Sequence, residues 1–179
     1  MNMPAGLQEF SLHSGLKPKE KIVTDKKTLI LGLGNEILSD DKIGPVLVHD
    51  LSQRISGANV SFRTAASGGL EIMELIRNYE KVVFIDAIHT RKGEPGDVYY
   101  FEPAEFMETS HLSSLHDIDF LTAIRLGHLL GVDLPVDLHF IAVEIIEDRE
   151  FSEEFTRPLK EKYPQILEEI TEKISQILE

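Results

Sequence analysis

Short apolar runs recur along the chain and predict buried strands. The clearest is residues 81–88 (KVVFIDAI), in which four consecutive apolar residues are followed by Asp86. Residues 27–33 (KTLILGL) form a second run, which stops at glycines as a buried strand would. Weaker strand patterns cover residues 58–64 (ANVSFRT), 97–102 (DVYYFE) and 138–143 (LHFIAV). We therefore expect about five strands.

Apolar residues at helical spacing separate these strands. Ile43, Val46, Leu47, Leu51 and Ile55 repeat at the period of a helix that begins after Asp41. Further helices are predicted over residues 69–79 (GLEIMELIRNY), 117–130 and 153–179, and Pro164 could interrupt the last of them.

This alternation of strands and helices predicts the fold class. Strands alternating with helices indicate an α/β fold, a three-layer α/β/α sandwich with a mostly parallel sheet of about five strands. In such sheets ligands bind beyond the carboxyl ends of the strands. Asp41 follows the first predicted strand and Asp86 ends the third, so both are candidate site residues.

The chain divides into two parts. Residues 1–27 are polar and lysine-rich without a sustained period, and we expect a poorly ordered N-terminal extension there. Residues 28–179 are of ordinary size for one domain, which we expect to be the functional domain. No internal repeat is visible.

Composition and charge exclude several classes of function. The net charge of −13 argues against a nucleic-acid partner, because phosphates would be repelled. The chain has no cysteine, which rules out disulfides, a thiol nucleophile and thiolate metal ligands. No apolar run approaches the roughly 18 to 20 residues of a membrane span, and the N-terminus lacks the pattern of a secretory signal. We expect a soluble, cytoplasmic protein with no membrane partner.

The loop after the first strand raises the question of a ligand. The stretch LILGLGNEILSDDKIG (residues 29–44) has a glycine turn followed by two adjacent aspartates. A dinucleotide site would need a third glycine where Ile37 stands, and the predicted helix begins too late to face a pyrophosphate. A P-loop is absent. Two carboxylates beyond the glycines fit a cation better than a phosphate.

Carboxylates and a histidine suggest a metal centre. Carboxylate oxygens and imidazoles bind zinc, nickel, manganese or iron, and three protein ligands leave positions open for chemistry. His116, in the segment SSLHDID, stands where a loop meets a predicted helix that Ser114 or Asp117 could cap. Together with Asp41 and Asp86 it forms a candidate trio.

Each member of the trio also has an ordinary structural interpretation. Asp40 or Asp41 could cap the following helix, although that would not explain both. Asp86 could form a turn, and His116 taken alone could be a surface or core histidine. Only the combination favours a site.

Several motifs, taken in order, resemble a known family. GLGNEILSDDKIG is similar to the G-x-G-N-x-x-x-x-D-[DE]-x-x-G signature of the [NiFe]-hydrogenase maturation proteases. The segments SGGLEIMELI, VVFIDAI, SSLHDIDFLTAIRLGHLLG and HFIAVEI resemble later segments of that family in the same order. The resemblance runs from about residue 28 to residue 147 and leaves out the N-terminal 27 residues.

The resemblance implies a function and a role for each candidate residue. Members of the family are endopeptidases that remove a C-terminal extension from the hydrogenase large-subunit precursor after nickel insertion. Carried over by motif, Asp41, Asp86 and His116 would contact nickel supplied by the substrate and would be catalytic, and zinc or cadmium could occupy the same site. The supporting loop residues would be Gly32, Gly34, Asn35, Asp40 and Gly44. The fold implied is phosphorylase/hydrolase-like.

Two departures from the family pattern bear on specificity. Lys42 replaces a small residue after the acidic pair, and Ser67-Gly68-Gly69-Leu70 stands where many relatives carry Asp-Gly-Gly-Thr.

The alternatives to a maturation protease are a non-proteolytic nickel-sensing assembly chaperone, or another metallohydrolase or peptidyl-tRNA-hydrolase-like enzyme on a similar sheet. The net charge argues against a tRNA substrate. Glu144, at the end of the last predicted strand, is a weaker candidate for the rim of the site.

Overall fold

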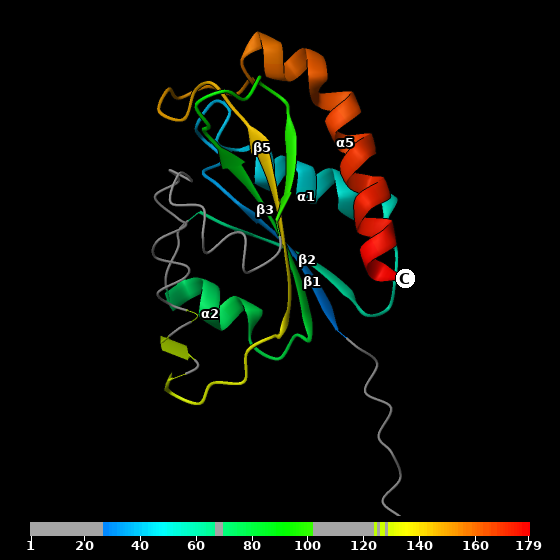
Figure 1. The fold of residues 1–179 in the computed structure, drawn as a ribbon. Coiled ribbons are helices and arrows are strands. Elements are labelled where there is room, and N and C mark those ends of the chain that lie inside the picture. Colours follow the sequence, from blue (N-terminus) through cyan, green and yellow to red (C-terminus); the bar gives the residue numbers. More distant parts are fainter. Residues whose placement is uncertain (1–26, 67–69, 102–123, 125, 128) are drawn as a thin grey trace, which may run out of the picture.

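A computed structural model describes residues 27–66, 70–101, 124, 126–127 and 129–179 (Figure 1). Its elements, in chain order, are β1 (Thr28–Leu33), α1 (Ile43–Arg54), β2 (Val60–Ala65), α2 (Leu70–Ile76), β3 (Lys81–Ile88), β4 (Val98–Phe101), β5 (Asp137–Glu144) and α5 (Arg157–Leu178). The predicted N-terminal extension, apart from Lys27, lies outside the described residues. None of the described helices is both long enough and apolar enough to cross a membrane.

The five strands form one mostly parallel sheet in the order β2-β1-β3-β5-β4. Strands β1, β2, β3 and β5 run parallel, and β4 pairs antiparallel with β5 at one edge. The prediction of a mostly parallel, five-stranded α/β sheet is therefore confirmed. Because β1 and β3 are direct neighbours, the loops that follow them meet at the same edge of the sheet.

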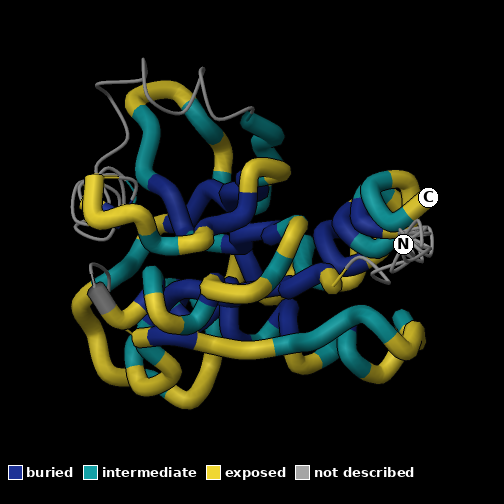
Figure 2. The backbone as a smooth tube through the Cα atoms, turned by 90° about the horizontal axis from the view of Figure 1, so that it is seen from below, coloured by how far each residue is buried: buried dark blue, intermediate teal, exposed yellow. Residues whose placement is uncertain are grey.

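Helices cover both faces of the sheet (Figure 1). On one face α1 and α5 pack on Val83 and Ile85 of β3, and on the other face α2 packs on Val82 and Phe84. This alternation follows from the two-residue period of a strand, and burial on both faces explains why β3 reads as a continuous apolar run. The buried residues accordingly concentrate at the centre of the molecule (Figure 2). The three-layer architecture is as predicted.

Helix α5 differs from its sequence-based prediction in two ways. It begins at Arg157 rather than at residue 153, with a proline in its first turn, where the missing N–H costs nothing. It also continues through Pro164 without a break. The apolar face of this helix is buried in the core through Leu159, Ile166, Leu167, Ile170 and Ile174. That packing offsets the one backbone hydrogen bond that Pro164 cannot make. The helix predicted over residues 117–130 lies mostly outside the described residues.

Gly44 allows α1 to lie directly on the sheet. A Cβ at this position would stand 2.2 Å from the carbonyl oxygen of Leu33 and 2.5 Å from that of Ile85. Both neighbours are backbone atoms and cannot turn aside. The first turn of α1 is therefore seated over the ends of β1 and β3, and only glycine permits this contact.

Gly44→Ala is expected to destabilise the fold by about 2 kcal/mol, because the added methyl forces α1 away from the strands. Urea denaturation followed by circular dichroism would measure the change. Gly57→Ala is a suitable control, since its Cβ would meet only the Val60 side chain, whose nearest atom is a methyl at 3.2 Å. Equal stability of the two variants would contradict the steric argument.

Candidate active site

The loop joining β1 to α1 fixes the carboxylate of Asp41. The backbone leaves β1 through Gly34, whose φ of +132° suits glycine alone, and a Cβ there would lie 2.0 Å from the Asp41 carbonyl oxygen. The Asn35 N–H donates to Asp41 Oδ2 at 2.7 Å. The Asn35 side-chain oxygen in turn accepts from the Ile37 N–H at 3.2 Å. Asn35 thus organises the loop through its backbone N–H, which bonds Asp41, and through its side-chain oxygen, which bonds Ile37, and the loop presents a half-buried Asp41.

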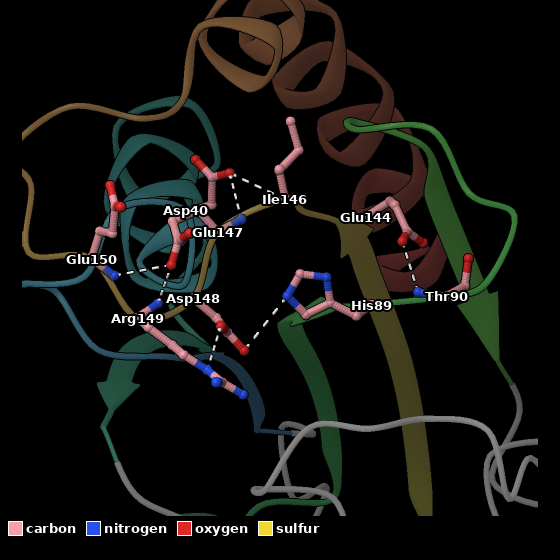
Figure 3. Close-up of polar contacts among 9 residues, drawn as sticks. All are labelled: Asp40, His89, Thr90, Glu144, Ile146, Glu147, Asp148, Arg149 and Glu150. Atoms are coloured by element: carbon pink, nitrogen blue, oxygen red, sulfur yellow. Dashed lines mark hydrogen bonds and ion pairs between the residues drawn. The ribbon is translucent and has the colours of Figure 1, made fainter.

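Asp40 points the opposite way, into the protein. Its side chain is completely buried and accepts hydrogen bonds from Thr156, through the N–H at 2.7 Å and Oγ1 at 2.8 Å. The Ile146 and Glu147 N–H groups donate to it at 3.3 Å each (Figure 3). Four donors satisfy a carboxylate that would otherwise be costly to bury. Asp40 therefore joins the β1–α1 loop to the loop between β5 and α5.

The helix-cap interpretation of the two aspartates is wrong. The N-cap residue of α1 is Lys42, and no side chain caps the helix. The acidic pair instead divides between a structural carboxylate, Asp40, and a presented one, Asp41. At this end of α1 the Ile43 N–H donates to the Asp40 carbonyl, and Gly44 rests on the backbone of Leu33 and Ile85.

Lys42 also faces the β5–α5 loop. Its buried ammonium group donates to the Ser152 carbonyl at 2.7 Å and lies over the Phe155 ring, 5.3 Å from its centroid. Burial lowers the pKa of Lys42, while Glu154, Asp40 and Glu153 act in the opposite direction. The positive charge that the sequence places beside the acidic pair is thus used to hold the neighbouring loop.

Asp86 lies near the carboxyl end of β3, on the strand adjacent to β1. It is half-buried, pairs in register with Ala142 of β5, and its Oδ1 accepts from the Ala87 N–H at 2.8 Å. The close approach of Gly44 to Ile85 brings the beginning of α1 next to this point. Asp41 and Asp86 therefore belong to the same corner of the sheet edge, as the parallel topology requires.

The third predicted ligand, His116, lies outside the described residues. Within the part of the chain that the structure describes, no three histidine, aspartate or glutamate side chains form a group that could hold a metal ion. Asp41 and Asp86 supply oxygen donors of the kind that suit a divalent cation. A complete ligand set at this corner needs at least one further donor, and the trio remains a prediction.

A histidine and an aspartate near this corner were missed from the sequence. His89 directly follows β3, and its Nε2 lies 3.5 Å from Oδ2 of Asp148 on the β5–α5 loop (Figure 3). The neighbouring Glu147 accepts from the Arg149 N–H at 2.7 Å and the Glu150 N–H at 3.0 Å, and these bonds lower its pKa. The position of His89 after the clearest strand was an available signal. Nothing in the sequence indicated its partner, which lies in a distant segment.

Glu144, considered for the rim, is instead buried at 3% exposure. Its Oε1 accepts from the Thr90 N–H at 2.7 Å (Figure 3), and its backbone pairs with Asp97 and Gly96. A Cβ on Gly93 would come within 2.2 Å of Oε2. Glu144 therefore fixes both ends of the loop between β3 and β4.

Comparisons with known proteins agree on one family. The family model described as hydrogenase maturation protease matches residues 45–173, a range that includes Asp86 and His116 but begins after Asp41. A curated relative, the hydrogenase 2 maturation protease of Escherichia coli (strain K12), is 31% identical over 104 residues. That alignment covers 55% of this chain and 63% of the relative, so the chain spans less than two thirds of the length of that protein.

Solved structures with similar folds carry related names. A hydrogenase maturating endopeptidase from E. coli superposes with a TM-score of 0.68 at 22% identity, covering 84% of this chain and 93% of that one. A [NiFe] hydrogenase maturation protease from Thermococcus kodakarensis gives a TM-score of 0.62 at 26% identity, covering 83% and 98%. The first likeness, at its low identity, establishes the fold alone.

Proposed function

The chain belongs to the hydrogenase maturation protease family, and from that premise we propose that it is an endopeptidase that removes the C-terminal extension of a [NiFe]-hydrogenase large-subunit precursor after nickel insertion. The observation that carries the proposal is the corner formed by Asp41 and Asp86. Two half-buried carboxylates lie there, Asp41 in the loop that follows β1 and Asp86 near the end of the adjacent parallel strand β3, at the edge where α/β sheets bind ligands.

In this proposal nickel is part of the substrate. Asp41 and Asp86 would bind the nickel already held by the precursor, together with His116, and this contact would select the nickel-loaded form. Zinc or cadmium could bind the same donors in the absence of precursor. The Asn35 N–H, which holds Asp41 Oδ2 at 2.7 Å, would keep that carboxylate in position, as hydrogen-bonded partners of metal ligands do.

The chemistry would then be peptide hydrolysis without a covalent intermediate on sulfur. The chain has no cysteine. Binding of the precursor at the corner would place the scissile carbonyl beside the carboxylates and so reduce the entropic part of the barrier. A carboxylate oxygen of Asp41 or Asp86 that does not bind the cation could accept a proton from the attacking water, and the nickel held by the precursor could polarise the carbonyl. Asp40 is buried and fully engaged by its four donors, so it has no part in this step.

Incubation with precursor tests the proposal directly. Nickel-loaded precursor large subunit should lose its C-terminal peptide, detected by mass spectrometry, whereas nickel-free precursor should stay intact. Binding of the nickel-loaded precursor without cleavage would instead support the nickel-sensing chaperone alternative. Equal cleavage of both precursors would refute recognition through nickel.

A further inference from the structure

The two loops at the candidate site expose large apolar side chains. We use the name paired loops for residues 35–42, which join β1 to α1, and residues 145–156, which join β5 to α5. Ile37 is 59% exposed, Ile146 48% and Phe151 78%. The other exposed large apolar residues of the described chain are Leu126, Leu129, Leu130 and Val136, all in a separate stretch. Large exposed apolar patches on a protein surface often mark interaction sites.

Backbone hydrogen bonds hold the paired loops together. Leu38 and Phe151 form an antiparallel bridge, and the Ser152 N–H donates to the Ile37 carbonyl at 3.2 Å. The Ser39 N–H donates to the Glu150 carbonyl at 2.8 Å. The exposed Ile37 and Phe151 side chains are therefore carried on neighbouring, mutually fixed backbone. A surface fixed in this way loses little conformational entropy when a partner binds.

The charge of the paired loops is strongly acidic. Glu36, Glu150, Glu153 and Glu154 are exposed, with Glu154 paired to Lys160, and Glu147 and Asp148 are half-buried. The paired loops carry two positive side chains, Arg149 and Lys42. Arg149 is exposed, whereas Lys42 is buried and donates to the Ser152 carbonyl, so only Arg149 offsets the negative charge at the surface. A complementary partner would therefore carry apolar groups for Ile37 and Phe151 and basic groups for the surrounding carboxylates.

The paired loops adjoin the candidate site, and this position indicates which molecule binds them. Ile37 donates its N–H to the Asn35 side chain, and Asn35 donates its own N–H to the Asp41 carboxylate. Asp40, next to Asp41, bonds the N–H groups of Ile146 and Glu147. A macromolecule that reaches Asp41 therefore meets the paired loops as well.

We propose that the paired loops are the docking surface for the precursor large subunit, and that the precursor face they accept is apolar at its centre with lysine or arginine side chains around it. This inference rests on the proposed function, since it takes the same substrate. It assigns recognition of the protein to Ile37 and Phe151, and recognition of the metal to the carboxylate corner. The two roles are separable by mutation.

The test compares Ile37→Ser/Phe151→Ser with a matched control, Val136→Ser. Val136 is 89% exposed and directly precedes β5, so its substitution removes an apolar group that is at least as exposed, at the end of β5 away from the paired loops. Binding of nickel-loaded precursor is measured by calorimetry, and cleavage by steady-state kinetics. We expect the double variant to bind at least about tenfold more weakly, with KM raised and kcat within about twofold of wild type. The control should behave as wild type.

The salt dependence of precursor binding provides a second test. Because the surface is acidic, added sodium chloride should weaken precursor binding to wild type, and Glu36→Gln/Glu150→Gln should reduce that salt dependence. Unchanged affinity in the Ile37/Phe151 double variant would overturn the docking proposal, and salt-independent binding would overturn its charge component. If wild type binds precursor through the paired loops but never cleaves it, the proposed protease function fails while the docking surface stands. If the double variant unfolds at a lower temperature than wild type, the same measurements are made on Phe151→Ser alone.

Discussion

Asp41→Asn and Asp86→Asn are each expected to reduce cleavage of nickel-loaded precursor by at least about 100-fold. Each replacement removes a negative oxygen donor that the proposed mechanism uses both to bind nickel and to position the peptide. Even changes to residues that only support a metal ligand commonly cost about 10- to 100-fold. Losing a direct ligand should cost no less.

The same substitutions should leave the fold nearly unchanged. Both side chains are half-buried at the sheet edge and asparagine keeps their size, so each substitution should cost about 1 kcal/mol or less. At residue 41 an asparagine oxygen can still accept the Asn35 N–H, so the loop keeps its hydrogen bond. The loss of activity would therefore not reflect unfolding.

A gel or mass-spectrometric assay of the released peptide, run beside a thermal melt, would check this prediction. Asp133→Asn is a matched control, because it removes an exposed carboxylate from the segment before β5. His116→Ala belongs in the same series, since it tests the predicted third ligand without altering either carboxylate. Near-wild-type cleavage by a well-folded Asp41→Asn protein would refute the ligand role of that residue. The same result for His116→Ala would remove His116 from the trio.

The predictions that succeeded depend on local periodicity. The strand predicted over residues 81–88 has the bounds of β3, Lys81–Ile88. Its pattern was clear because a strand buried on both faces is apolar at nearly every position. Helix α1 follows Asp41 as its spacing indicated, and the alternation of elements correctly gave the parallel sheet. The same topology puts the loop that carries Asp41 and the strand end that carries Asp86 at one edge of the sheet, and their role as ligands stays a prediction.

The predictions that failed concern contacts between distant segments. The sequence shows two equivalent aspartates, and only the fold reveals that Thr156, more than a hundred residues away, turns Asp40 inward. Likewise, local rules predict that Pro164 could break its helix, and long-range packing of Ile166 and Ile170 overrides them. The pairing of His89 with Asp148 also depends on how the β5–α5 loop returns to the sheet edge. Such outcomes are tertiary and leave no periodic signal.

Asp40→Ala, in contrast to Asp41→Asn, should strongly destabilise the protein. Removal of the buried carboxylate leaves the N–H groups of Thr156, Ile146 and Glu147 and the Thr156 hydroxyl without their acceptor. Each buried donor left unsatisfied costs about 1 to 3 kcal/mol, so a total loss of roughly 3 to 5 kcal/mol is expected once water entry and the longer bonds are allowed for. For a domain of this size that corresponds to a fall in Tm of roughly 10 °C.

Thermal and urea melts of Asp40→Ala, Asp40→Asn and Thr156→Val would measure the contribution of this link between the loops. Thr156→Val removes the hydroxyl donor and keeps the N–H, so its cost should be near 1 kcal/mol, well below that of Asp40→Ala. Asp40→Asn keeps one acceptor oxygen, loses the charge and adds two donors, and should fall between them. At a temperature where it is folded, Asp40→Ala should still cleave nickel-loaded precursor, because Asp41 and Asp86 remain. A melt indistinguishable from wild type would show that the loops are held without Asp40, and total loss of cleavage by the folded variant would give Asp40 a role in the chemistry.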